Sequence, residues 1–178
     1  MANDVPMTGY RVQRALPAHI GALPAIERAA AEGFPDRLLP LSSRGVVQPT
    51  AALAAAQAEG RLWVALSLEQ EPVGFALAEI AGEIALLTEV DVHPNHQRQG
   101  LGRALVEAVI AWAQQAGVEA LTLTTFASLP WNAPFYERLG FRRLDRTALE
   151  GRLAQALQEE ARRGLQDRVA MRLDLGAI

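Results

Sequence analysis

The sequence contains no cysteine and no long apolar run, and its charge is nearly balanced. The absence of cysteine excludes disulfides, thiolate metal sites and covalent thiol catalysis. The formal net charge of -3 argues against nucleic acid or an anionic membrane as a partner, because both require a basic surface. The chain has no membrane-spanning apolar stretch, and its N-terminal sequence lacks the basic and apolar segments of a signal peptide. We therefore expect a cytoplasmic protein.

The length and composition of the chain suit one globular domain. It has 178 residues, of which 50% are hydrophobic and 21% are charged. These values are typical of a folded protein with a single core. We find no internal repeat, and residues 1–178 are interpreted as one domain.

Turn residues and apolar periodicity divide the chain into alternating strands and helices. The expected strands are residues 10–15, 61–68, 72–80, 83–92, 119–125, 141–144 and 168–174. The expected helices are residues 18–32, 51–59, 100–116, 132–139 and 147–163. Short separators between the central strands predict an antiparallel meander. The strand–helix–strand unit that follows predicts a parallel pair, so the chain is expected to be mixed α/β.

The loop between the strand ending at residue 92 and the helix beginning at residue 100 has the features of a phosphate-binding turn. The first N–H groups of a helix lack partners within the helix, and the helix dipole makes this end attractive to anions. Gly100 and Gly102 allow the backbone to approach a phosphate closely, and Arg98 and Arg103 can add charge. The alternative is an ordinary helix start that tolerates two glycines.

Two other nucleotide-binding sites fit this loop poorly. A Rossmann site requires glycine where Leu105 stands and an acidic residue where the next strand ends in Thr124 and Thr125. A P-loop requires Gly-Lys followed by serine or threonine, and this sequence is absent. The sequence of the loop therefore leaves two interpretations, a phosphate-binding turn of another kind and an ordinary helix start.

Two segments resemble the Gcn5-related N-acetyltransferases (GNAT), and bacterial ribosomal-protein alanine acetyltransferases in particular. One is Gln97-x-x-Gly100-x-Gly102, preceded by Val90 and Val92. The other is residues 130–141, Pro-Trp-Asn-Ala-Pro-Phe-Tyr-Glu-Arg-Leu-Gly-Phe. The resemblance implies the α/β GNAT fold, a mixed, mostly antiparallel sheet of six to seven strands with helices on both faces. It also implies direct transfer of an acetyl group from acetyl-CoA to a primary amine.

The resemblance implies cofactor-binding roles for two groups of residues. In the family, the strand before the loop binds the acetyl carbonyl and the pantetheine arm through its main chain, which here means Val90 and Val92. The family's pyrophosphate-binding amides correspond to Arg98, Gln99, Gly100, Leu101, Gly102 and Arg103. Asn132 has two interpretations: it contacts the cofactor arm, or it caps the helix that follows. Capping is favoured, because the usual asparagine position falls on Leu129.

The resemblance also implies catalytic roles. Tyr136 matches the tyrosine that protonates the departing coenzyme A thiolate, and the alternative is aromatic packing. The position of a candidate base in the resembling enzymes is held by Thr124, which cannot act as a base near neutral pH. Glu89 is the alternative base, although strand alternation places it on the face opposite Val90. A water chain that ends on several groups is equally compatible with the sequence.

The acceptor and the partners are less defined by the sequence. The amine belongs to a small molecule, a peptide or a protein, and acidic groups near the first helices would suit it: Glu27, Glu32 and Asp36, beside Arg37 and Phe34. His93, His96 and Asp91 form too weak a grouping for a metal site, so no metal is expected. A homodimer through the C-terminal strands is compatible with the fold. The rival function is a non-catalytic acyl-CoA-binding or regulatory module.

Overall fold

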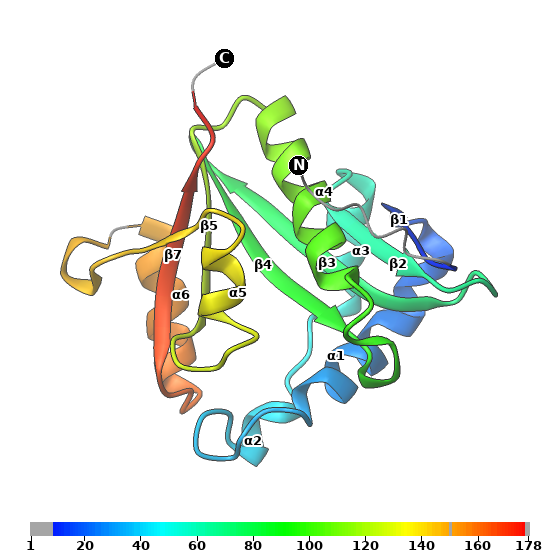
Figure 1. Cartoon of the computed structure of the whole chain (residues 1–178), viewed down its shortest axis with the longest axis horizontal. Helices are drawn as coiled ribbons and strands as arrows, with labels where there is room; N and C mark the ends of the chain where they lie inside the picture. Colours follow the sequence, from blue (N-terminus) through cyan, green and yellow to red (C-terminus); the bar gives the residue numbers. More distant parts are fainter. Residues whose placement is uncertain (1–8, 150, 177–178) are drawn as a thin grey trace.

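The computed structural model describes residues 9–149 and 151–176, and a seven-stranded mixed sheet forms its centre (Figure 1). The strand order is β1-β2-β3-β4-β5-β7-β6, so the last strand lies between the two before it. The strands are β1 (Arg11–Arg14), β2 (Leu62–Leu66), β3 (Pro72–Ala81), β4 (Ile84–Val92), β5 (Ala120–Phe126), β6 (Arg142–Arg143) and β7 (Arg168–Asp174).

Helices cover both faces of the sheet, as the sequence predicts (Figure 1). The α-helices are α1 (Leu23–Ala31), α2 (Leu41–Arg44), α3 (Thr50–Ala58), α4 (Leu101–Gln115), α5 (Ala133–Glu137) and α6 (Gly151–Arg162). The described residues also form three short 3₁₀ helices: η1 (Pro17–Ala22), η2 (Pro94–His96) and η3 (Arg146–Ala148). No helix among the described residues is long and apolar enough to cross a membrane.

Side-chain alternation along the strands divides the core into two layers. On β2, Trp63 and Ala65 face the cluster formed with α4. Leu62, Val64 and Leu66 face the other cluster, which includes residues of α1 and α3. Because successive strand residues point to opposite faces, buried apolar residues at every position of β2 require a helix layer on each side.

The predicted parallel pair is confirmed, but it is short. β4 and β5 are paired only where Ile84–Leu86 meets Ala120–Thr122. All the other strand pairs of the sheet are antiparallel among the described residues. Beyond this pairing the two strands diverge, as Figure 1 shows in the wedge between β4 and β5. The wedge leaves main-chain groups of β4 without a neighbouring strand.

A β-bulge at Thr88 sets the direction of the side chains in the second half of β4. Leu87 pairs with Ala78 and Glu89 pairs with Leu77, so Thr88 is the extra residue in the ladder. A bulge moves every later side chain of the strand to the other face. Val90 consequently packs against the α4 cluster. Glu89 lies on the opposite face with Glu27 of α1, so the predicted separation of Glu89 from Val90 is confirmed.

Three regions differ from the sequence-based expectation. The connection at residues 34–49 contains the short helix α2, and the helix expected at residues 18–32 begins as the 3₁₀ helix η1. The helix expected at residues 147–163 begins later, because Asp145 caps the 3₁₀ turn η3 and Leu149 is extended. Glu150, within that expected helix, and residues 1–8, which bear on the signal-peptide prediction, lie outside the described residues.

Candidate active site

The loop that was predicted to bind phosphate turns sharply into α4. Gly100 is the N-cap residue of α4 and has a left-handed φ of 80°, a conformation that glycine adopts without strain. Arg98 also has a positive φ, of 60°. The side chain of Gln97 donates a hydrogen bond to the carbonyl of Val92 at 3.1 Å. This bond ties the loop back to the end of β4.

Gly102 occupies a place where no packing demands a glycine. A Cβ built there would meet no heavy atom of the described chain within 4 Å. Gly74 is different, because an added Cβ would lie 2.9 Å from the carbonyl oxygen of Asp91. Alanine would also favour a helix more than Gly102 does, by up to ~1 kcal/mol. The space beside Gly102 is therefore open to a ligand that approaches the α4 amides.

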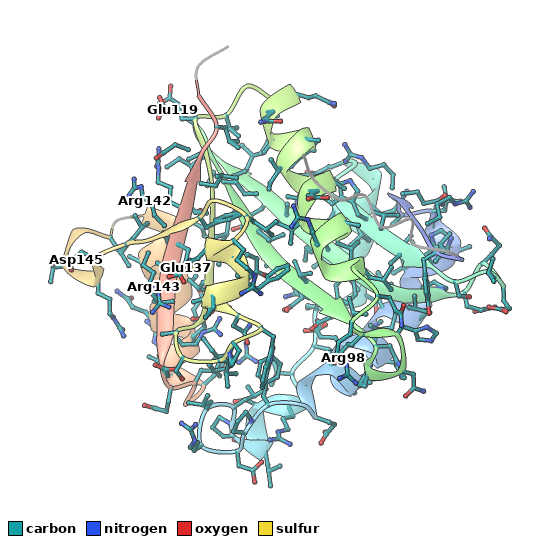
Figure 2. The ribbon with its side chains drawn as sticks, viewed as in Figure 1. Arg98, Glu119, Glu137, Arg142, Arg143 and Asp145 are labelled. Atoms are coloured by element: carbon teal, nitrogen blue, oxygen red, sulfur yellow. The ribbon has the colours of Figure 1, made fainter. Side chains whose placement is uncertain are left out.

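A groove of about 650 Å³ extends from this helix start to α5. The predicted cofactor residues that line it are Val90, Val92, Arg98, Gly100, Leu101, Gly102, Arg103 and Asn132. Gln99 is exposed and lies in the same turn. Arg103 forms an ion pair with Glu107 at 2.7 Å. Arg98 lies on the loop after β4, on the side away from Arg142 and Arg143 of β6 (Figure 2). The open helix start and nearby arginines fit a pyrophosphate.

Tyr136 lies on α5 between two other aromatic rings. Its ring centroid is 5.0 Å from that of Phe135 and 5.6 Å from that of Phe141. Burial raises the pKa of Tyr136 well above its usual value, and the charges of Glu89 and Asp91 raise it further. The phenol is therefore protonated throughout the physiological pH range and can donate a hydrogen bond to a neighbouring anion. The predicted packing and proton-donor roles are compatible with each other.

Asn132 occupies the N-cap position of α5, but its side chain does not cap the helix. The expected capping bond is therefore wrong. The side-chain amide instead donates to the hydroxyl of Thr125 on β5, at 2.9 Å. Its carbonyl oxygen Oδ1 is buried without a partner. The side chain thus keeps an unused acceptor at the edge of the groove.

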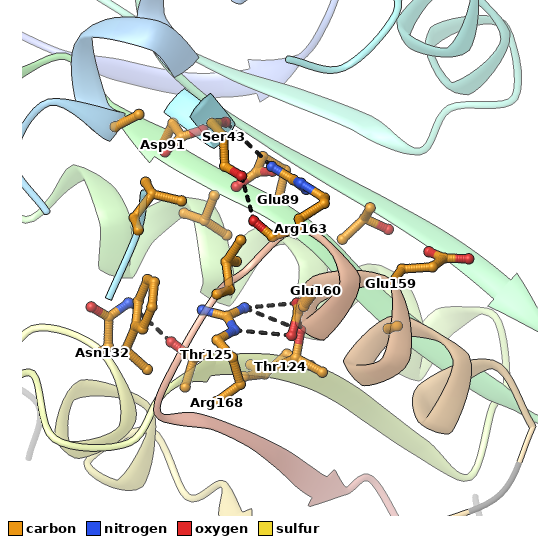
Figure 3. A pocket seen from close by; sticks show the side chains of 18 of the residues that line it. Ser43, Glu89, Asp91, Thr124, Thr125, Asn132, Glu159, Glu160, Arg163 and Arg168 are labelled. Carbon is orange, nitrogen blue, oxygen red and sulfur yellow. Dashed lines mark hydrogen bonds and ion pairs between the residues drawn. The ribbon is translucent and has the colours of Figure 1, made fainter. Parts of the chain in front are cut away.

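A second cavity, of about 400 Å³, lies on the other side of the wedge between β4 and β5 (Figure 3). Its walls come from α1, the 34–49 connection, β4, β5, α5, α6 and β7. Five residues line both this cavity and the groove: Phe34, Val90, Asp91, Asn132 and Tyr136. The two cavities therefore meet at β4, opposite the aromatic ring of Tyr136. We refer to the groove of about 650 Å³ as the cofactor groove and to the cavity of about 400 Å³ as the acceptor cavity.

Three carboxylates form a compact cluster in the acceptor cavity. Oxygen atoms of Glu27, Glu89 and Asp91 lie within 4.8 Å of one another. Glu27 comes from α1, where its Oε2 accepts the amide N–H of Gln48 at 2.8 Å. The sequence grouped Glu27 only with other acidic residues of the first helices. The bulge at Thr88 is what turns the two β4 carboxylates toward it.

The carboxylate cluster holds protons more tightly than isolated acids do. Burial, followed by repulsion from Glu89, raises the pKa of Glu27 to about 7. Burial also raises the pKa of Glu89, against the opposing attraction of Arg168. The pKa of Asp91 is raised well above its usual value by burial and by the other two carboxylates. Because close like charges cannot all ionise easily, the cluster shares protons near neutral pH. Three carboxylates could also ligate a hard cation.

The buried side-chain oxygens that lack a hydrogen-bond partner all line the acceptor cavity. Within the described residues they are Thr88 Oγ1, Asp91 Oδ2 and Asn132 Oδ1. Buried polar atoms are nearly always hydrogen-bonded in folded proteins. Asn132 Oδ1 can only accept a hydrogen bond, and the same holds for Asp91 Oδ2 when Asp91 is ionised. The cavity is therefore suited to a ligand with several N–H donors.

The position expected for a base on β5 is instead part of an ion-pair network. The hydroxyl of Thr124 donates to Glu160 of α6 at 2.5 Å. Glu160 also pairs with Arg168 of β7, at 2.8 Å, and both side chains are largely buried. A carboxylate from α6 thus reaches the place where β5 carries none. No sequence pattern points to Glu160, because the mixed charges of α6 are typical of a solvent-exposed helix face.

Other residues noted in the sequence lie apart from the cluster. Glu32 and Asp36 pair with Arg44 and are exposed. The two loop histidines are hydrogen-bonded: His96 Nδ1 is 3.0 Å from the hydroxyl of Tyr10, and His93 Nδ1 accepts the N–H of Asn95. The acidic grouping near the first helices therefore divides into Glu27, inside the cavity, and the exposed pair outside it.

Comparison with known proteins agrees with this geometry. The model of the acetyltransferase (GNAT) family matches residues 25–141. A [Ribosomal protein bS18]-alanine N-acetyltransferase of Escherichia coli K12 is 38% identical over 85 residues, which cover 48% of this chain and 57% of that protein. An aminoglycoside N(6')-acetyltransferase type 1 of Stenotrophomonas maltophilia is 36% identical over 75 residues, covering 37% of this chain and 49% of that protein. The matched region thus spans about half of each relative.

Solved structures extend the similarity to nearly the whole chain. The crystal structure of the ribosomal-protein-S18-alanine N-acetyltransferase from Escherichia coli has a TM-score of 0.67 and 25% identity, covering 95% of this chain and 96% of that one. Rv2747 from Mycobacterium tuberculosis, in complex with CoA and NLQ, has a TM-score of 0.66 at 20% identity, covering 93% and 99%. The GNAT fold is confirmed. With a family model that matches most of its length, the chain belongs to the acetyltransferase (GNAT) family.

Proposed function

We propose that the protein is an acetyl-CoA-dependent N-acetyltransferase that acetylates a primary amine in a ternary complex. The observation that carries this proposal is the junction of two cavities at β4. The cofactor groove and the acceptor cavity share Val90, Asp91 and Tyr136. A thioester in one cavity and an amine in the other would meet between the strand and the phenol. Holding two reactants in this way is a large source of catalysis.

The chain's own groups suit coenzyme A as the carrier of the acetyl group. The amides at the start of α4 would hold the pyrophosphate, with Arg98 and Arg103 adding charge. The unpaired stretch of β4 would align the pantetheine arm through its main chain, and the N–H of Val90 would polarise the acetyl carbonyl. When bound, acetyl-CoA supplies an acyl group on a thiol leaving group. No metal takes part in this proposal.

The acceptor cavity suits an amine that must lose a proton before it reacts. The carboxylate cluster of Glu27, Glu89 and Asp91 would accept that proton. The amine nitrogen would then attack the acetyl carbon, so that a C–N bond forms and the C–S bond breaks. Tyr136 would protonate the departing sulfur. Of the two protons that the amine nitrogen loses, one restores the phenol of Tyr136 and the other leaves through the cluster to solvent, so one proton is released for each amide formed.

The related proteins frame the range of acceptors. One relative bears the name of an alanine N-acetyltransferase of a ribosomal protein, and another that of an aminoglycoside acetyltransferase. Protein amines and small-molecule amines therefore both belong in a first panel. Thr124, in place of a glutamate on β5, and the Glu160 contact to it distinguish this cavity from the pattern of the alanine acetyltransferases.

Acceptor-dependent release of CoA tests the proposal. The wild-type protein is incubated with acetyl-CoA and a panel of amino acids, polyamines, aminoglycosides and peptides, and free thiol is measured. We expect CoA to be released only when one class of acceptor is present. The rival function, a non-catalytic acyl-CoA-binding module, predicts tight binding of acetyl-CoA by calorimetry and no release with any acceptor. Failure to bind acetyl-CoA would contradict both.

A further inference from the structure

The acceptor cavity is lined by charged groups of both signs. The carboxylates of Glu27, Glu89 and Asp91 lie together on β4 and α1. Figure 3 shows Arg163, the residue after α6, beside Ser43 and Glu89, and Arg168 of β7 beside Glu160. A ligand that fills the cavity therefore meets carboxylates and a guanidinium group close together. A zwitterion of matching length complements such a field.

Arg163 differs from the other arginines that line the cavity. The others are in ion pairs: Arg44 with Glu32 and Asp36, Arg152 with Glu79 and Glu159, and Arg168 with Glu160. Within the described part of the chain, Arg163 has no ion pair. Its guanidinium donates one long hydrogen bond, of 3.5 Å, to the carbonyl of Ser43.

This guanidinium is exposed toward the cavity, and most of its donors remain for a ligand. It attracts the charges of Glu27 and Glu89 through space, which partly offsets the rise in their pKa. A carboxylate on the ligand would offer the planar, two-point partner that arginine binds best. Arg163 is thus the side chain of this cavity best placed to recognise an acid group.

The side of the acceptor cavity that carries Arg163 is closed by contacts between the α2 region and the end of α6. The buried hydroxyl of Ser43 donates to the carbonyl of Arg163 at 2.7 Å. The N–H of Gln166 donates to the carbonyl of Leu38 at 3.0 Å. Gly164 lies so close to Pro40 that an added Cβ would be 3.2 Å from its ring. These contacts leave no passage for a polypeptide between α2 and α6, and 400 Å³ suits a small molecule.

We infer that the acetyl acceptor is a free amino acid, whose ammonium group lies against the carboxylate cluster and whose carboxylate pairs with Arg163. The inference rests on the proposed function and narrows its substrate class. The unpaired oxygens of Asp91 and Asn132 accept N–H donors of the ammonium group. A polyamine would leave Arg163 facing a second positive charge. A protein terminus would be blocked on this side of the cavity by the contact between α2 and the residues that follow α6.

The test compares acceptors that differ only in the acid group, on variants that differ only in one arginine. Release of CoA is measured with the twenty free L-amino acids, then with the amide of the best one and with a tripeptide that begins with it. We expect kcat/KM to be about tenfold or more higher for the free acid than for the amide. The variant Arg163→Gln should lower kcat/KM for the acid by a similar factor and change the value for the amide by less than about twofold.

Arg162→Gln is the matched control, because Arg162 is the exposed neighbour on α6 and does not line the cavity. Arg162→Gln should leave kcat/KM unchanged for both the acid and the amide. The inference is overturned if the amide, the tripeptide or a polyamine is the better acceptor, or if Arg163→Gln lowers activity equally for acid and amide. Either result would leave the acetyltransferase proposal standing.

If acetyl-CoA binds but no acceptor releases CoA, the proposed function fails and binding decides the inference separately. Calorimetric titration of the CoA-loaded protein with each amino acid would then show whether one binds and whether Arg163→Gln weakens it by about tenfold. Absence of binding by every amino acid would overturn the inference.

Discussion

The cofactor groove and the acceptor cavity meet at Tyr136 but are made of different chemical groups. The groove depends on main-chain amides at the start of α4, on unpaired β4 backbone and on the empty space beside Gly102. The acceptor cavity depends on charged side chains from distant parts of the chain, such as Glu27 and Arg168. Affinity in the groove should therefore respond to backbone shape and bulk. Selectivity in the cavity should respond to charge and pH.

The largest effect is expected where the two cavities join. Tyr136→Phe removes the proton donor while keeping the ring between Phe135 and Phe141. We expect kcat to fall by about a hundredfold or more, with acetyl-CoA affinity unchanged by calorimetry. Tyr10→Phe is the control, because its hydroxyl contacts His96 outside the junction, and it should leave kcat unchanged. A Tyr136→Phe variant with full activity would remove the phenol from the mechanism.

The next effect separates bulk in the groove from fold stability. Gly102→Val places a side chain in the open space beside the α4 amides. We expect acetyl-CoA affinity to fall by about a hundredfold, as two charge-assisted hydrogen bonds are lost. The free energy of unfolding should stay equal or rise, because valine favours a helix more than glycine does.

Gly21→Val is the matched control for this change. Gly21 is exposed in η1, and an added Cβ there also meets no heavy atom of the described chain within 4 Å. Equal loss of affinity in both variants, or none in Gly102→Val, would contradict the assignment of the groove.

The carboxylate cluster should control the pH dependence of the reaction. Because an ionised base is needed and the pKa of Glu27 is raised to about 7, kcat/KM should rise with pH to a plateau above neutrality. Glu27→Gln removes one of the charges that raise the pKa of Asp91. The acidic limb of the profile should therefore move to lower pH, by about one unit. An unchanged limb would exclude the cluster as the base.

The same pKa shift predicts a change in stability with pH. The folded protein binds the Glu27 proton more tightly than the unfolded chain does, since its pKa of about 7 exceeds the ordinary 4.5. Stability from this group is therefore lost as pH rises from 4.5 to 7. Glu27→Gln should lose less stability than wild type across this range. The free energy of unfolding in urea is measured at about pH 5 and about pH 8, near the two limits of the range. A steeper loss of stability in Glu27→Gln than in wild type would contradict the raised pKa of Glu27.

The smallest effect concerns the wall of the cavity. Ser43→Ala removes the buried hydrogen bond from Ser43 to the carbonyl of Arg163 and should cost about 1 kcal/mol of unfolding free energy. Amide exchange should accelerate in α6 and remain slow in α4. Ser42→Ala, at the exposed neighbouring position, should change neither. Equal exchange in both variants would show that α6 is held by other contacts.

The cofactor groove could largely be predicted from sequence, because its groups are contiguous. Gly100 and Gly102 lie two residues apart on a strand–turn–helix segment, and helix geometry dictates where their amides point. The strands and helices near this segment also follow from periodicity: β7 has the predicted bounds, and α4 differs by one residue at each end. The catalytic and binding roles of these residues remain predictions.

The acceptor cavity could not be predicted in the same way. Glu27, Glu89 and Glu160 are far apart in sequence, and only the sheet order brings them to one place. Alternation indicated the face of Glu89, but nothing indicated that Glu27 would approach it or that α6 would reach Thr124. The side chain of Asn132 was expected to cap α5, and the nearby hydroxyl of Thr125 binds it instead. Local rules for a helix end fail where the side chain finds a partner outside the helix.

The most direct test of the central claim, that groove and cavity form one site, is the affinity of a bisubstrate compound. The sulfur of CoA is joined through a CH₂–C(=O) group to the nitrogen of the acceptor found by CoA release, and its binding is measured by calorimetry beside that of CoA. The shared wall at Val90 and Tyr136 predicts that the joined compound binds about a hundredfold or more tightly than CoA. An affinity no better than that of CoA would contradict the claim that an amine and a thioester meet there.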